Sequence, residues 1–358
     1  MREEQGICLS ALTTMRVGGP AQRLVTAQTT DELVDAIREV DDADEPLLVV
    51  AGGSNLVVSD QGFSGSVVRV ATSGVWVESQ DSAAVMVRVA AGEIWDEVVV
   101  QAVAQGWSGI EALSGIPGCA GATPIQNVGA YGQEVAQTIA SVRVWDRREQ
   151  RVHTFANEDC QFTYRSSLFK AQPRYVVLDV VLRLAVSTLC GPVEYAGLAQ
   201  ALGVDTGQRV ALAEAREAVL AQRRQKGMVL DAADHDTWSC GSFFTNPVMS
   251  PGSYAALQER VRTRLGSSDG ATRPPRFDAP HGQVKTSAAW LIDKAGFSKG
   301  YRMPGPAALS TKHSLAVTNR GSATAADIVA LAREIGDGVH DAFGVRLVNE
   351  PVLVGISL

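Results

Sequence analysis

The sequence has few cysteines and histidines, and those that it has are scattered. Its five cysteines are an odd number, and no two of them form a Cys-x-x-Cys pair. This excludes a disulfide framework and a zinc ribbon. The five histidines also lie far apart along the chain, so their spacing predicts no metal site.

Long runs of basic charge and long apolar runs are also missing. The net charge is −7, which argues against a general nucleic-acid-binding protein, because nucleic acids bind basic surfaces. No apolar stretch approaches the roughly 20 residues that a membrane-spanning helix needs. The first residues, Met1 to Gln5, are partly acidic and no apolar stretch follows them, so we expect no secretory signal. These features predict a cytoplasmic protein with no nucleic-acid or membrane partner.

The chain does have enough apolar sequence for more than one core. Hydrophobic residues make up 46% of its 358 positions and charged residues 20%, which is typical of globular proteins, and this length predicts two or three domains. Short alternating segments and helical patterns together indicate an α+β fold. The patterns predict a helix after an N-cap at Thr30, a helix at 93–104, and strands at 47–50, 67–70, 85–89, 142–145 and 175–184.

The later part of the chain is predicted to be more helical. Residues 185–225 carry a mostly helical pattern, and a polar stretch at 227–238 then opens a third region. Thr324 begins a variant of the capping box, which predicts a helix start. Further predictions are helices at 286–295 and 324–335, and a strand at 345–356 that is interrupted at 349–351.

The stretch from Gly109 to Gly132 is rich in glycine and proline. Its six glycines let the backbone approach a ligand closely or adopt positive φ, and Pro117 and Pro124 stiffen it. Apolar residues such as Ile116 distinguish it from a flexible linker. The composition predicts an ordered loop that holds a ligand, or else a turn-rich connection between strands.

A second glycine turn, Gly52-Gly53-Ser54-Asn55-Leu56, directly follows the predicted strand at 47–50. Backbone N–H groups in such a turn can bind phosphate. The turn does not match Gly-x-Gly-x-x-Gly, and the chain contains no Walker pattern, so this signal is unspecific by itself.

Three side chains are candidates for chemistry. Arg165 lies in the segment 160–170 and, if that segment is a strand, shares a face with Thr163. It offers a permanent cation whose planar fork matches a carboxylate. Ser242, between a glycine and two phenylalanines, could donate a proton in a water-poor pocket. Glu350 lies among apolar residues, where a carboxylate is costly unless it is paired or protonated. The ordinary alternatives are a solvated arginine, a turn hydroxyl and a strand-end glutamate.

Basic residues near loops in the later half form another candidate. Lys226 with its arginine neighbours, and Lys285, are either ordinary surface charge or a clamp for phosphates. An acidic protein that binds anionic ligands must provide such a clamp locally.

Taken together, these segments resemble the UDP-N-acetylenolpyruvoylglucosamine reductase family. The resemblance covers nearly the whole chain, and its specificity comes from the order of the segments. They are 13–20 (TTMRVGGP), 51–56 (AGGSNL), 116–121 (IPGCAG), 124–132 (PIQNVGAYG), 164–170 (YRSSLFK), 241–247 (GSFFTNP) and 290–293 (WLID).

The resemblance implies an α+β fold of three domains. Two of them form an FAD-binding module of the vanillyl-alcohol-oxidase (PCMH) type, and an α/β domain binds the substrate. The implied boundaries are 1–70, joined by the C-terminal strand 343–358, then 71–226 with a tyrosine-bearing loop, then 227–342.

The implied activity is the reduction of the enolpyruvyl double bond of UDP-N-acetylglucosamine enolpyruvate. The product is UDP-N-acetylmuramate, a peptidoglycan precursor. Non-covalent FAD carries the hydride, NADPH is the co-substrate, and we expect a monomer.

The resemblance also assigns residues. It implies that Arg165, Ser242 and Glu350 are catalytic, and it implies no metal ligand. The residues that it places at FAD are Gly52, Gly53, Ser54, Asn55, Leu56, Ile116, Pro117, Gly118, Gly121, Ala122, Thr123, Gly129 and Tyr131. Those that it places at the substrate or the NADPH phosphates are Tyr164, Tyr195, Arg223, Lys226, Asn246 and Lys285.

The sequence departs from the family pattern at two positions. Pro351 follows the C-terminal glutamate, whereas we would expect a proline before it, and Ala122 replaces a residue that is often serine.

Two alternatives stay open: an oxidase of the same flavin superfamily, and a non-catalytic flavin or nucleotide-sugar binder. The first histidine is His153, which argues against a histidyl-linked flavin in the first domain.

Overall fold

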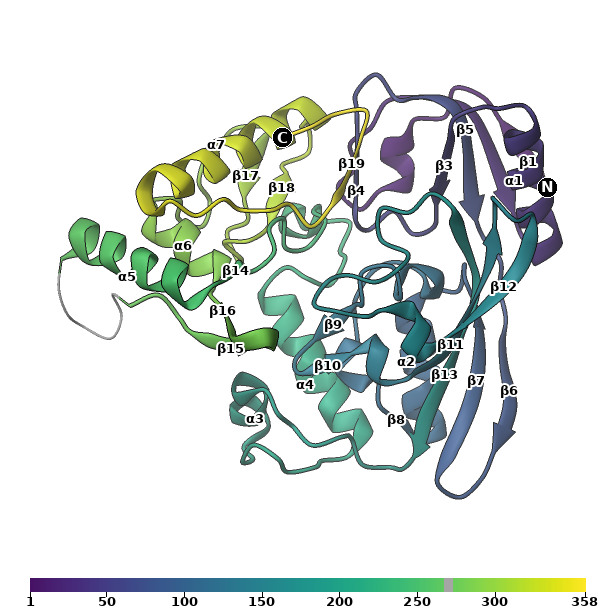
Figure 1. The fold of residues 1–358 in the computed structure, drawn as a ribbon, viewed down its shortest axis with the longest axis horizontal. Helices are drawn as coiled ribbons and strands as arrows, with labels where there is room; N and C mark the ends of the chain where they lie inside the picture. The colour runs from purple at the N-terminus through teal and green to yellow at the C-terminus, as the bar shows by residue number, and fades with distance from the viewer. Residues whose placement is uncertain (267–272) are drawn as a thin grey trace. The chain divides into compact units, whose positions relative to one another are not determined.

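Two units make up the chain in the computed structural model, which describes residues 1–266 and 273–358 (Figure 1). Unit 1 comprises Met1–Cys8, Pro20–Gly53 and Phe63–Leu230. Unit 2 comprises Leu9–Gly19, Ser54–Gly62 and Asp231–Leu358. The predicted three-domain boundaries stay a prediction.

Unit 1 begins with a four-stranded sheet and a helix. Strand β5 pairs in parallel with β2 and β3, and β1 pairs antiparallel with β2. Helix α1 buries Leu33, Ile37 and Val40, as their helical spacing predicts. Its N-cap is Thr29, one residue before the predicted position, because the Thr29 side chain accepts the bond from the Glu32 N–H. The bounds are β1 Arg2–Glu4, β2 Ala21–Ala27, α1 Thr30–Asp42, β3 Leu47–Val50 and β5 Phe63–Val70.

A second, antiparallel sheet of unit 1 has the order β12-β11-β13-β7-β6, with β8 also on β13. Figure 1 shows β13 between β11 and β7. Branched apolar residues of both sheets form one continuous core, in which Val68, Val87 and Val180 are almost fully buried. The bounds are β6 Val75–Gln80, β7 Ala84–Ala90, α2 Trp95–Gln105, β8 Trp107–Ser108, β11 Ile139–Asp146, β12 Arg151–Ala156 and β13 Tyr175–Val186.

The rest of unit 1 is less helical than the sequence predicts. Only two helices occur between 185 and 225, because residues 189–193 pair instead with 207–211. These helices and their linking segments bury a small separate core that includes Cys190, Leu198 and Val219. The bounds are β9 Gly129–Ala130, β10 Gln133–Glu134, α3 Ala196–Leu202 and α4 Leu212–Gln225.

Unit 2 has a core between three helices and the β17–β18 hairpin. Helix α7 begins with the predicted capping box, in which Thr324 and Asp327 exchange hydrogen bonds. The Asp60 carboxylate accepts from the N–H groups of Ala325 (2.7 Å) and Ala326 (3.0 Å) at the same helix end. The bounds are β14 Val248–Met249, α5 Pro251–Leu265, β15 Phe277–Ala279, β16 Gln283–Lys285, α6 Ala288–Lys294, β17 Ala307–Leu309, β18 Val317–Asn319 and α7 Ala325–Phe343.

The C-terminal segment of unit 2 pairs with an early strand of the same unit. Strand β19 (Val352–Val354) pairs in parallel with β4 (Leu56–Val58). The predicted strand at 345–356 is longer than the observed strand β19, because residues 345–348 are not in a strand. Within 1–266 and 273–358, no helix has the length and apolar character that spanning a bilayer requires.

Candidate active site

Arg165 lies in a turn of unit 1, so the segment 160–170 is not the strand that the sequence leaves possible. Its φ is 52°, a left-handed conformation that non-glycine residues rarely adopt. Thr163 and Ser166 close the turn by an isolated antiparallel bridge. The Lys170 Nζ donates to the Arg165 carbonyl oxygen at 2.8 Å and so stabilises the turn.

The guanidinium of Arg165 is held by the glycine-rich loop. Its Nη2 donates to the Gly129 carbonyl oxygen at 2.7 Å, and its Nη1 donates more weakly to the Asn127 carbonyl oxygen at 3.4 Å. The guanidinium carbon also lies 5.3 Å from the ring centroid of Tyr164. The loop backbone therefore determines where this cation lies.

Four residues predicted to contact ligands lie together elsewhere in unit 1. The rings of Tyr131 and Tyr195 are 5.4 Å apart and perpendicular, and Lys226 Nζ lies 5.5 Å from the Tyr131 ring centroid. Arg223 Nη2 donates to the Met228 carbonyl oxygen at 2.7 Å. The buried Arg223 Nε has no hydrogen-bond partner among the residues that the structure describes. This donor fits an anionic ligand group.

Burial changes the titration of two residues of this group. It raises the pKa of Tyr131, and Arg223 opposes that effect only in part. Burial also lowers the pKa of Arg223. At neutral pH Tyr131 is therefore an uncharged phenol that can donate a hydrogen bond.

Ser242 and Glu350 lie on neighbouring segments of unit 2. Phe244 and Asn349 form an isolated antiparallel bridge, and the Glu350 N–H donates to the Phe243 carbonyl oxygen at 2.8 Å. The Phe243 and Phe244 side chains are buried and pack edge to face. Both candidate residues are half-buried. The structure therefore brings together two residues that are far apart in sequence.

Asn55 connects the second glycine turn to the same part of unit 2. Its Nδ2 donates to the Glu350 carbonyl oxygen at 3.2 Å, and its own carbonyl oxygen accepts from the Val352 N–H at 2.9 Å. A residue predicted to bind FAD thus lies next to a residue predicted to be catalytic.

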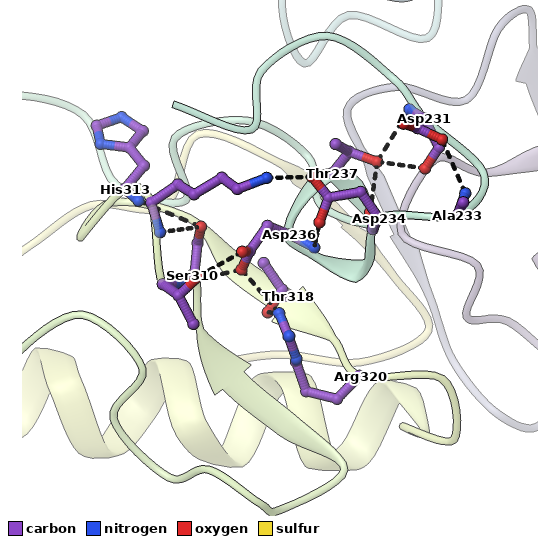
Figure 2. Close-up of polar contacts among 11 residues, drawn as sticks. Asp231, Ala233, Asp234, Asp236, Thr237, Ser310, His313, Thr318 and Arg320 are labelled. Atoms are coloured by element: carbon purple, nitrogen blue, oxygen red, sulfur yellow. Dashed lines mark hydrogen bonds and ion pairs between the residues drawn. The ribbon is translucent and has the colours of Figure 1, made fainter. Parts of the chain in front are cut away.

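Figure 2 shows a polar network around Asp236, which precedes Ser242 by six residues. Asp236 Oδ1 accepts from Arg320 Nη1 at 2.8 Å and from the Thr311 N–H at 2.9 Å. Lys312 pairs with Asp234 in the same network. The loop that Thr311 begins then presents the Leu315 carbonyl oxygen to the Phe243 N–H at 2.8 Å. The network therefore determines the position of the backbone next to Ser242.

The charge of Asp236 is retained although the residue is buried. Burial raises the pKa of this carboxyl, but the hydrogen bonds from Thr311 and Arg320 outweigh burial, so its pKa lies below the usual value. An ionised Asp236 keeps all of these acceptor bonds.

Comparisons with known proteins identify the family of this chain. A family model described as "UDP-N-acetylenolpyruvoylglucosamine reductase, C-terminal domain" matches residues 232–354, and a model described as "FAD binding domain" matches residues 21–155. UDP-N-acetylenolpyruvoylglucosamine reductase of Streptomyces coelicolor is 56% identical over 352 residues, which is 98% of this chain and 90% of that protein. The chain belongs to the UDP-N-acetylenolpyruvoylglucosamine reductase family.

Two further relatives support membership of this reductase family. The reductase of Thermobifida fusca is 52% identical over 354 residues, covering 99% of this chain and 98% of that protein. The crystal structure of UDP-N-acetylenolpyruvylglucosamine reductase from Thermus caldophilus superposes with a TM-score of 0.67 at 26% identity and covers 99% of each chain. The predicted resemblance, the multi-domain α+β fold and a flavin-dependent oxidoreductase activity are confirmed.

The glycine turns of this reductase family member fit FAD. A Cβ on Gly52 would lie 2.6 Å from the Gly118 Cα, and a Cβ on Gly121 would lie 2.4 Å from the Ala91 Cβ. The turns are thus in direct backbone contact, and Gly118 has a φ of 115°. Bare backbone of this kind allows close approach to a pyrophosphate. Most residues predicted to bind FAD belong to unit 1, whereas Ser54, Asn55 and Leu56 belong to unit 2.

The remaining predicted ligand-binding residues lie in unit 2. Asn246 Oδ1 accepts from the Ala288 N–H at 3.0 Å, at the start of α6. Lys285 ends β16, where it is opposite Val248 of β14. Because Arg165, Tyr195 and Lys226 belong to unit 1, the meeting of both sets of residues at one ligand stays a prediction.

Sequence alone does not single out three buried residues whose hydrogen bonds support the candidate segments. They are Glu111, Asn127 and Asp236, each at most 4% exposed. Asn127 Nδ2 donates to the Thr163 carbonyl oxygen (3.1 Å) and to Glu134 Oε2 (2.7 Å), which ties the Arg165 turn to the loop. For Glu111 and Asn127 an available signal is a polar residue inside an apolar or glycine-rich stretch, because such a residue needs internal partners. Asp236 lies in the polar stretch 227–238 and carries no such signal.

Proposed function

We propose that this member of the reductase family reduces the enolpyruvyl double bond of UDP-N-acetylglucosamine enolpyruvate to give UDP-N-acetylmuramate. FAD, when bound, supplies a hydride that it receives from NADPH. The observation that carries this proposal is the full-length match at 56% identity, in a chain whose site geometry fits the required chemistry. The catalytic roles of Arg165, Ser242 and Glu350 are part of the proposal.

Arg165 binds the substrate carboxylate. Reduction of a double bond conjugated to that carboxylate places additional negative charge on its oxygens, so a fixed cation stabilises the transition state. The bonds to the Gly129 and Asn127 carbonyl oxygens hold the guanidinium in one place before substrate binds. Such preorganisation avoids reorientation during the reaction.

Glu350 acts on the same carboxylate as a hydrogen-bond donor, either protonated itself or sharing a proton with the substrate. The backbone bond from Glu350 to Phe243 fixes its distance from Ser242 along the paired segments. A neutral acid adds no negative charge next to the developing enolate.

Ser242 gives a proton to the carbon that bears the ether oxygen. A hydroxyl is a weak acid, but a carbanion-like carbon is a stronger base, so the transfer is favourable. The neighbouring Phe243 and Phe244 rings are buried in the core of unit 2 and so anchor the backbone beside Ser242 in apolar surroundings.

Tyr195, Arg223 and Lys226 bind the substrate or the NADPH phosphates, next to Tyr131, which is predicted to bind FAD. Lys226 supplies positive charge for a diphosphate, as does Arg223, whose Nε has no hydrogen-bond partner within the described part of the chain. Tyr195 is 44% exposed, which suits a side chain that covers a ligand. Tyr164, Asn246 and Lys285 complete the proposed contacts.

The purified protein tests this proposal in a spectrophotometer. We expect a yellow protein whose flavin absorbance is lost with NADPH in the absence of oxygen and returns when UDP-N-acetylglucosamine enolpyruvate is added. Reoxidation by oxygen with an alcohol substrate would support the oxidase alternative, and absence of NADPH oxidation would support a non-catalytic binder.

The proposed monomeric state and cytoplasmic location have separate tests. NADPH and nucleotide sugars are cytoplasmic metabolites, so the proposed substrates favour that compartment. Light scattering after size exclusion measures the mass against 37.9 kDa for one chain, and cell fractionation measures the location.

A further inference from the structure

A cavity of about 330 Å³ lies in unit 1 next to the segment that carries Tyr195. Residues 190–198 are called here the tyrosine segment. Part of the cavity lining comes from this segment, and another part comes from residues around Glu111 and Gln133. Cys190, Val193 and Leu198 of this segment pack in the small core that also contains Ala112. Where the cavity interrupts this packing, polar contacts across the gap add to it.

Glu111 makes such a contact. Its carboxylate Oε1 accepts from the Gly191 N–H at 2.8 Å, and Gly191 is the second residue of the tyrosine segment. The same Oε1 accepts from Gln133 Nε2 at 3.0 Å, and Oε2 accepts from the Gly109 N–H at 2.6 Å. One buried carboxylate thus binds three separate parts of the chain.

The contacts of Glu111 continue to the ligand-binding tyrosines. Gln133 follows Tyr131 by two residues, and its Oε1 accepts from the Ala112 N–H at 2.8 Å. At the other end, the tyrosine segment leads from Gly191 to Tyr195, whose ring lies 5.4 Å from that of Tyr131. Glu111 therefore holds the backbone near Tyr131, through Gln133, and the backbone near Tyr195, through Gly191, and so affects the distance between the two rings.

The chemistry requires a carboxylate at this position. A buried carboxylate is costly unless its oxygens accept hydrogen bonds, and Glu111 is 2% exposed. A glutamine could accept at only one of the two oxygen positions, so its NH₂ group would face a backbone N–H. Either the bond to Gly109 or the bond to Gly191 would be lost.

We propose that Glu111 is a positioning residue that holds the tyrosine segment in the conformation that binds the nucleotide substrate. This inference rests on the proposed function, in which Tyr195 binds the substrate. Glu111 does not touch the reacting atoms. Its effect is on the fraction of molecules in which Tyr195 and Tyr131 are spaced for binding, and that fraction scales the apparent affinity.

The first test replaces Glu111→Gln in the FAD-loaded protein. We expect KM for UDP-N-acetylglucosamine enolpyruvate to rise about tenfold or more, the size of one lost charge-assisted hydrogen bond. The value of kcat and the flavin reduction rate at saturating NADPH stay within about twofold. Glu194→Gln is the matched control, because Glu194 lines the same cavity from an exposed position, and its KM is expected to be unchanged.

A second pair of variants tests the bond from its other end. Gly191→Pro removes the N–H that Glu111 accepts. Gly191→Ala keeps that N–H, and its Cβ would meet only ordinary contacts at 3.7 Å from Gln133 Nε2 and 3.8 Å from Glu111 Oε1. We expect the proline variant to raise KM as Glu111→Gln does and the alanine variant to behave as the wild type. If Glu111→Gln does not fold, this pair of variants still shows whether the hydrogen bond between Gly191 and Glu111 is needed for substrate binding.

Hydrogen exchange gives a readout that needs no activity. In Glu111→Gln, amides of residues 190–211 are expected to exchange at least about tenfold faster than in the wild type, while those of β11 and β13 stay unchanged. Normal exchange and normal KM in both Glu111→Gln and Gly191→Pro would overturn the inference. A wild-type protein that shows no substrate-dependent flavin reoxidation would instead overturn the proposed function, and exchange would still decide the role of Glu111.

Discussion

Nη2 of Arg165 donates a hydrogen bond of 2.7 Å to the carbonyl oxygen of Gly129. The two residues are 36 positions apart, and both belong to segments that are predicted to contact ligands. A Cβ on Gly129 would lie 3.2 Å from Arg165 Nη1, so the guanidinium lies directly against the loop backbone. The loop predicted to bind FAD thus also orients the cation predicted to bind the substrate carboxylate.

Arg165→Lys tests the need for a planar cation. Lysine keeps the charge but cannot bind the Gly129 carbonyl oxygen and a carboxylate with one fork. We expect kcat for substrate reduction to fall roughly 10²-fold, the effect of losing one preorganised electrostatic contact. Stopped-flow measurement of flavin reoxidation by substrate gives this rate. The flavin content and flavin reduction by NADPH are the controls, and a normal reoxidation rate would contradict the proposed role.

Gly52→Ala tests the contact between the two glycine turns. The added Cβ would lie 2.6 Å from the Gly118 Cα, so the turns must separate. We expect the purified variant to lose most of its flavin, measured as the ratio of flavin to protein absorbance.

Gly336→Ala is the matched control for this glycine variant. Gly336 lies inside α7, and an added Cβ would meet nothing within 4 Å. Alanine is favoured over glycine in helices, so this variant should keep its flavin and gain roughly 0.5–1 kcal/mol of stability. Full flavin content in Gly52→Ala would show that the turn contact is not needed.

The regular elements could be predicted from local sequence, but the site geometry could not. The spacing of Leu33, Ile37 and Val40 predicts α1, because one helical face must be apolar. The sequence predicts an N-cap at Thr30, one residue after the observed Thr29, because both are suitable caps and only geometry distinguishes them.

Local sequence does not predict the turn at Arg165, because the partners that form it are distant in sequence. Alternating Phe162 and Tyr164 are typical of a strand, whereas the partners that form the turn include Asn127, 36 residues before Thr163. The roles of Ser242 and Glu350 came from the resemblance, and local sequence gave no sign of the pairing between their segments.

Ser242→Ala tests the proposed proton donor. Removal of one positioned donor should slow substrate reduction on the order of 10²-fold or more, and flavin reduction by NADPH should stay nearly normal. Separate stopped-flow measurements of the two half-reactions give both rates. Equal slowing of both would indicate a structural effect on the site and would contradict a role in protonation.

Asp146→Asn tests an ion pair that stabilises unit 1. Arg174 donates to Asp146 through Nε (2.8 Å) and Nη2 (2.6 Å). These bonds lower the pKa of Asp146 from its usual 3.8 to about 2. Because the folded-state pKa lies below the unfolded one, the pair stabilises the fold fully above about pH 5, and this contribution is lost as the pH falls towards 2.

We therefore expect Asp146→Asn to lower the free energy of unfolding by about 2 kcal/mol at pH 7 and by clearly less near pH 3. Urea unfolding of wild type and variant at both pH values measures the difference. Asp205→Asn, at an exposed position of the same unit, should leave the free energy of unfolding unchanged at both pH values. A loss that is as large at pH 3 as at pH 7 would mean that the ionised pair is not its cause.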